Sequence, residues 1–106
     1  MLRDFFLGFI KIHILYHAAQ EPIYGLEMIR ELATHGYDLS PGTLYPILHR
    51  LEEQGYLAAE KQVVGGKARK YYTATAEGKE MLAKAYTQAW ELWREISPDE
   101  FTAGST

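Results

Sequence analysis

Two short stretches of this sequence carry the side chains best suited to holding a polyanion. The first follows Ser40 and combines hydroxyl groups, an imidazole and a guanidinium with Gly42, which lets a backbone approach a ligand closely. The second places three cations within four positions, next to Gly65-Gly66. A helix could present the first stretch to a DNA major groove, and a basic loop could neutralise phosphates. The DNA-binding candidates are Ser40, Gly42, Thr43, Tyr45, Pro46, His49, Arg50, Lys67, Arg69 and Lys70.

The distribution of charge supports this interpretation better than the net charge of -3 does. Residues 40–70 carry five basic and three acidic side chains, a local charge of +2. Residues 1–39 carry a charge of -2 and residues 71–106 a charge of -3. Positive charge is therefore concentrated in the segment that holds both stretches.

A second type of chemistry is indicated by His13 and His17, which are four positions apart and share one face of a helix. With His35 or Glu21 as a third ligand they could hold a divalent metal ion. Helical pairs of this kind also serve as packing or surface residues, so the metal site stays open.

Enzyme chemistry is not indicated, and we expect neither catalysis nor a cofactor. The sequence has no glycine-rich phosphate loop, no serine elbow, no HExxH motif and no diagnostic pair of carboxylates. It also has no cysteine, which excludes disulfides, thiolate zinc sites and a thiol nucleophile.

The elements that position these residues follow from periodicity and from turn signals. Helices are expected over residues 2–19, 24–35, 41–54 and 75–96, and strand-like runs over 57–64 and 69–73, joined by a turn at 65–68. The second helix should bury Leu26, Ile29 and Leu32 or Ala33, and the third Leu44, Ile47, Leu48 and Leu51. Ser40 should cap the third helix through its side chain, Pro41 should occupy its first position, and Pro46 inside it is not explained by the pattern.

A helix, a tight turn, a second helix and a hairpin make a winged helix-turn-helix. The fold class is therefore mainly α with a small β-hairpin, to which a C-terminal dimerisation helix is added. We expect a DNA-binding domain over residues 1–75, the dimerisation helix over 76–97 and a flexible tail over 98–106.

The dimer follows from apolar residues that a domain of this size has no means to cover alone. The first helix has more apolar residues than one stripe holds, and the last helix has a seam with steps of four and three. The predicted interface consists of Phe5, Phe6, Phe9, Leu82, Tyr86, Ala89, Trp93 and Ile96. Trp90 and Trp93, with Tyr86, could also stack on a planar aromatic effector.

Several ordered motifs make the chain resemble the PadR family of transcriptional regulators. The resemblance covers roughly residues 12–82 and rests on Tyr24-Gly25, Ser40-Pro41-Gly42-Thr43-Leu44-Tyr45-Pro46, Leu48, Arg50-Leu51-Glu52, Gly55-Tyr56-Leu57, Arg69-Lys70-Tyr71-Tyr72, Thr75 and Gly78. Ala74 departs from the pattern, which usually has leucine there. The resemblance implies a homodimer joined by its first and last helices, which represses transcription until a small aromatic effector weakens DNA binding. Pro46 belongs to the family pattern.

The partners expected are thus double-stranded DNA with an inverted-repeat operator, a second copy of the chain and an aromatic effector. The apolar run at residues 5–10 follows Asp4, is interrupted by Lys11 and is too short to span a bilayer, so we expect a cytoplasmic protein with no membrane partner. Two alternatives remain: a winged-helix module that binds a protein without DNA, and a repressor that responds to metal.

Overall fold

The computed structural model describes residues 1–97, so the tail predicted over residues 98–106 lies outside the described part. The elements are α1 (Leu2–Gln20), α2 (Gly25–Thr34), α3 (Pro41–Glu53), β1 (Leu57–Val64), β2 (Lys67–Ala74) and α4 (Ala76–Glu95). The strands form one antiparallel hairpin. The predicted class, mainly α with a winged hairpin, is confirmed.

Glycines with positive φ follow α2 and α3 and form the turn of the hairpin. Gly36 (φ 88°) follows α2 and Gly55 (φ 85°) follows α3. Gly65 and Gly66, with φ of 59° and 79°, form a two-residue turn of the kind that matches the twist of a hairpin. The predicted turn over residues 65–68 was therefore too long, because Lys67 already pairs with Val64.

The core is built from α1, α2, α3, the start of β1 and the end of β2. In α3 the predicted inner face is confirmed, since Leu44, Ile47, Leu48 and Leu51 are all buried. In α2 the prediction was partly wrong, because Leu26 is 48% exposed and Met28 is buried with Leu32.

Pro46 leaves α3 continuous over all its 13 residues. Its ring removes the donor that would bond to the carbonyl group of Gly42. Gly42 is exposed, so water can satisfy that carbonyl group, and the proline costs less here than it would in a buried helix.

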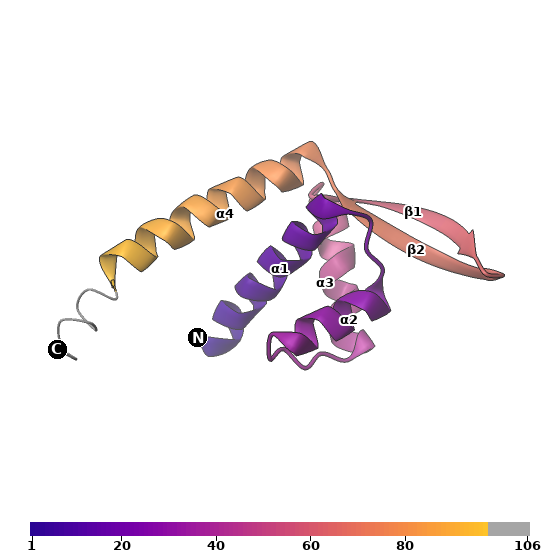
Figure 1. Ribbon diagram of the computed structural model, residues 1–106, viewed down its shortest axis with the longest axis horizontal. Coiled ribbons are helices and arrows are strands. Elements are labelled where there is room, and N and C mark those ends of the chain that lie inside the picture. Colours follow the sequence, from indigo (N-terminus) through magenta and orange to yellow (C-terminus); the bar gives the residue numbers. More distant parts are fainter. Residues whose placement is uncertain (98–106) are drawn as a thin grey trace.

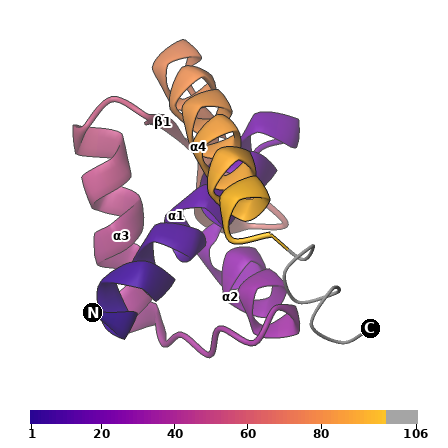
Figure 2. The same cartoon turned by 90° about the vertical axis from the view of Figure 1, so that its left-hand side faces the viewer.

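The hairpin and α4 extend in opposite directions from the three-helix body (Figure 1). In the end view, α2 and α3 lie on either side of α1 and α4 (Figure 2). Two backbone hydrogen bonds between Ile23 and Tyr72, of 2.7 and 2.9 Å, attach the hairpin to the segment between α1 and α2. Among residues 1–97, no helix has the length and apolar character needed to cross a bilayer.

Candidate nucleic-acid interface

One face of α3 is polar and open to solvent. Its apolar residues point into the core, so the remaining positions of the helix point outward. All seven predicted residues of this element are exposed: Ser40, Gly42, Thr43, Tyr45, Pro46, His49 and Arg50. The structure thus groups them on the polar surface of one helix, an element that a DNA major groove can admit.

The first turn of α3 differs from the prediction in one respect. The Ser40 hydroxyl does not cap the helix; its Oγ lies 3.3 Å from Oγ1 of Thr43. The amides of Thr43 and Leu44 donate instead to the carbonyl oxygen of Ser40. Two adjacent hydroxyls therefore stand at the positive end of the helix dipole, where phosphate oxygens are favoured.

Tyr45 is 37% exposed and also contacts a second helix. Its ring lies against Gly25 at the start of α2, and a Cβ atom at Gly25 would stand only 2.5 to 2.6 Å from the hydroxyl oxygen and ring carbons of Tyr45. Gly25 therefore provides the space in which Tyr45 packs, and the tyrosine helps to set the angle between α2 and α3.

The cations of the hairpin are divided between its two faces. Successive residues of β2 point to opposite faces of the hairpin. Lys67 and Arg69 therefore share one face, and Lys70 lies on the other. Lys70 is directly opposite Lys61, which lies on the same face of the hairpin. Lys61 was absent from the sequence-based candidates, although the strict alternation of the two strands was a signal that could have added it.

Arg69 is held by aromatic side chains. Its guanidinium carbon lies 4.5 Å from the centre of the Tyr24 ring, and Tyr24 meets Tyr71 edge-on at 5.5 Å. This cation–π contact orients Arg69 while its charge stays available, because an aromatic ring does not neutralise a guanidinium. Tyr24 is thus a positioning residue that the sequence-based analysis left out.

Lys70 forms an ion pair with another residue of the chain. Its Nζ atom lies 3.1 Å from Oε1 of Glu52 on α3, and this hydrogen bond raises the pKa of Lys70. The pair joins the hairpin to the last turn of α3. Lys70 is therefore less available to a phosphate than Lys61 or Lys67, for which no ion pair is found within residues 1–97.

A groove between α1 and α4 collects most of the predicted interface and effector residues. It has a volume of about 490 Å³ and is lined by Phe5, Phe9, Tyr86, Ala89, Trp90, Leu92, Trp93 and Ile96. We call these eight residues the α1–α4 groove. Of the other two predicted interface residues, Phe6 packs near Tyr37 instead, and Leu82 is partly buried against the core.

The two histidines predicted to bind metal lie near a third one. His13 and His17 of α1 are grouped with His35, and not with Glu21. Burial and the nearby imidazoles of His35 and His17 lower the pKa of His13. Glu31 of α2 adds a carboxylate that contacts His17 and His35.

Comparison with known proteins gives consistent results for sequence and structure. The model of the transcriptional regulator PadR-like family matches residues 14–84. The chain is 44% identical over 105 residues to the transcriptional regulator Rv3488 of Mycobacterium tuberculosis, covering 98% of both proteins.

Two solved structures illustrate the likeness of the fold. A PadR family transcriptional regulator from Eggerthella lenta is 36% identical, with a TM-score of 0.78 over 91% of this chain and 85% of that one. A putative transcriptional regulator, TA0346 from Thermoplasma acidophilum, is 30% identical with a TM-score of 0.78, over 93% of this chain and 96% of the other.

Proposed function

Because the chain belongs to the PadR-like family of transcriptional regulators, which is not a family of enzymes, we propose that it binds double-stranded DNA as a homodimer. In this proposal α3 enters the major groove and the hairpin follows the adjacent phosphates. The main observation that supports this proposal is the polar, exposed face of α3. The Lys70–Glu52 ion pair joins this helix to the basic hairpin. Residues 1–75 form the DNA-binding domain, and binding to genomic DNA places the site of action in the cytoplasm.

The dimer is proposed on the basis of apolar side chains that the monomer leaves uncovered. Tyr86 is 71% exposed and Trp93 is 53% exposed, and Phe5 and Phe9 face the same groove. Packing α4 of one copy against α1 and α4 of another would bury these rings. A twofold dimer repeats α3, so the operator should be an inverted repeat with half-sites one helical turn apart, about 34–36 Å, or a multiple of it.

We also propose that the chain is a repressor and that an aromatic effector releases it from DNA. The α1–α4 groove carries Tyr86, Trp90 and Trp93, whose rings can stack on a planar ligand. Its volume of about 490 Å³ falls within the range of small-molecule sites, about 300 to 1,000 Å³. A ligand there would change how the two copies pack, and with it the separation of the two α3 helices.

A salt-titrated DNA-binding series tests the proposal. The probes are the duplex upstream of the chain's own gene and a scrambled duplex of the same composition. Lys67→Ala should weaken binding to both and flatten the slope of log affinity against log salt by roughly 0.9 for each phosphate that the variant no longer neutralises. Thr43→Val and His49→Ala should cost about 1 to 3 kcal/mol on the specific duplex only, if these side chains reach base edges.

Lys84→Ala is the matched control, because it removes the same charge from α4, which extends away from the hairpin (Figure 1). It should leave both the affinity and the slope unchanged. If wild type binds neither duplex at low salt, the interface serves another partner and the protein-binding alternative replaces the proposal.

A further inference from the structure

Three of the chain's four histidines meet where α1 crosses α2. His13 and His17 come from α1, and His35 directly follows α2 as its C-cap. Each offers one ring nitrogen, and these three nitrogens lie within 4.8 Å of one another. We call these residues the histidine cluster.

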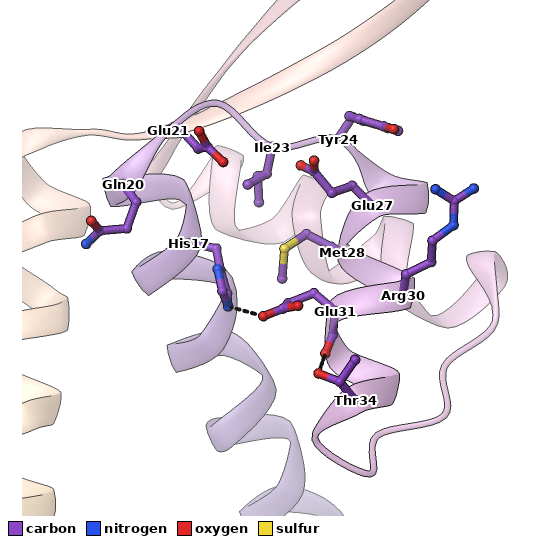
Figure 3. A pocket seen from close by; sticks show the side chains of 10 residues that line it. All are labelled: His17, Gln20, Glu21, Ile23, Tyr24, Glu27, Met28, Arg30, Glu31 and Thr34. Atoms are coloured by element: carbon purple, nitrogen blue, oxygen red, sulfur yellow. Dashed lines mark hydrogen bonds and ion pairs between the residues drawn. The ribbon is translucent and has the colours of Figure 1, made fainter.

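Glu31 adds an oxygen to the histidine cluster. Its Oε1 atom lies 3.2 Å from Nε2 of His17 and 3.7 Å from Nε2 of His35. Figure 3 shows the side chains of His17 and Glu31 pointing toward each other across the gap between the two helices. Ligand atoms placed about 2.0–2.1 Å from a tetrahedral zinc ion are about 3.4 Å apart, so these two separations already match a coordination sphere.

The cluster is accessible to an ion from solvent. His17 and Glu31 line two hollows, one on the side of the α1–α2 connection and one beside α4. His35 is exposed, and the rings of His13 and His35 are stacked with their centres 4.4 Å apart.

We propose that His13, His17, His35 and Glu31 bind one divalent transition-metal ion, which ties α1 to α2. Three imidazoles and one carboxylate form a set that suits zinc, cobalt or nickel. Calcium and magnesium require several oxygen ligands, and the cluster offers only one carboxylate. None of these four residues lies on α3 or on the hairpin, so binding of the ion can be measured without DNA.

The competing interpretation is that the imidazoles and Glu31 form only two ion pairs and a ring stack. In that case the residues hold α1 on α2 without any ion, and added metal has no effect on the folded chain. The two interpretations differ in what the wild-type protein does in the presence of metal, so the first measurement needs no variant.

The experiment uses the full chain, free of any affinity tag and treated with a chelator that is then removed. Cobalt(II) is titrated in and its visible absorption recorded; zinc is then titrated by calorimetry. We expect one ion per chain, a cobalt spectrum with the intense bands of a four-coordinate site, and a rise in Tm with zinc. Absence of binding above the level of nonspecific surface sites, with no shift in Tm, would overturn the proposal.

The variants assign the ligands. His13→Gln, His17→Gln and His35→Gln should each lower zinc affinity by at least tenfold, and Glu31→Gln should shift the cobalt bands. His49→Gln is the matched control, because it removes the remaining histidine of the chain, which lies on α3, and it should keep wild-type affinity. If all four histidine variants bind zinc equally well, the cluster is not the site. Circular dichroism of each metal-free variant verifies that it is folded.

Discussion

The side-chain hydroxyl of Thr75 donates a hydrogen bond of 2.6 Å to the carbonyl oxygen of Gly55. The same oxygen of Thr75 accepts from the amide of Gly78, at 3.0 Å, and so caps α4. Gly55 is the residue at which the chain turns after α3. One side chain therefore fixes the beginning of the proposed dimerisation helix to the end of the proposed recognition helix.

Removing this hydroxyl should loosen the link between α3 and α4. Thr75→Ala loses a helix cap, worth about 1 to 2 kcal/mol, and a further hydrogen bond to Gly55 of about 1 kcal/mol. Thr75→Ser should restore most of the loss. The measurement is urea unfolding at a fixed protein concentration, with Thr87→Ala, a substitution within α4, as the control. Equal stability of Thr75→Ala and Thr87→Ala would show that the link contributes nothing.

Two glycine substitutions should separate stability from DNA binding. A Cβ atom at Gly78 would overlap the backbone oxygen of Tyr56, whereas at Gly42 its nearest neighbour would be the Ser40 hydroxyl at 3.8 Å. Gly78→Ala should cost about 1 to 3 kcal/mol of folding free energy, because backbone has to move. Gly42→Ala should leave stability at or above that of wild type and weaken DNA binding, because the added methyl group would face the DNA in the proposed complex. A destabilised Gly42→Ala, or one with unchanged affinity, would contradict this assignment.

The Glu52–Lys70 pair should restrain DNA binding. Glu52→Gln removes a negative charge beside the hairpin and frees Lys70, whose pKa is raised by the hydrogen bond to Glu52 and which stays charged at neutral pH. Affinity for DNA should rise, and the salt slope should steepen by up to about 0.9 per half-site. Glu53→Gln makes the same charge change one residue away without releasing a lysine. Identical gains from both variants would mean that Lys70 was already available to phosphate.

Apolar contacts in the α1–α4 groove should hold the dimer together. Tyr86→Asp and Ala89→Asp place charges among Phe5, Phe9 and Trp93, and burial of an unpaired carboxylate is costly. Sedimentation equilibrium should show monomers for the double variant and dimers for wild type at micromolar concentration. Gln88→Asp, on α4 but outside the groove, should remain dimeric. A stable wild-type monomer would remove the proposed interface.

Periodicity predicted the elements whose apolar residues form one unbroken stripe. The spacing of Leu44, Ile47, Leu48 and Leu51 gave the buried face of α3 correctly. The same reasoning was wrong for Leu26, because the apolar residues of α2 form one wide arc. Packing against α1 and α3 buries the side of this arc that holds Met28 and Leu32, and Leu26 lies at its opposite edge.

The contacts that complete the candidate site could not be predicted from local patterns. The ring of Tyr24 under Arg69 and the carboxylate of Glu52 beside Lys70 come from segments separated by 45 and 18 positions. Such pairs depend on how the hairpin lies against the helices, which in turn depends on the bridge between Ile23 and Tyr72. The composition of α3 predicted which residues face outward, but not that Ser40 and Thr43 turn their hydroxyls toward each other.

Selection of binding sites from a pool of random duplexes tests the central proposal most directly. The wild-type protein is incubated with the pool at about 0.1 M salt, and bound duplexes are sequenced over several rounds. The account predicts an enriched inverted repeat whose half-sites are about 10 base pairs apart, centre to centre, or a multiple of this spacing, with two chains bound per site. A final pool with the base composition of the starting pool, or enriched sequences without twofold symmetry, would contradict it.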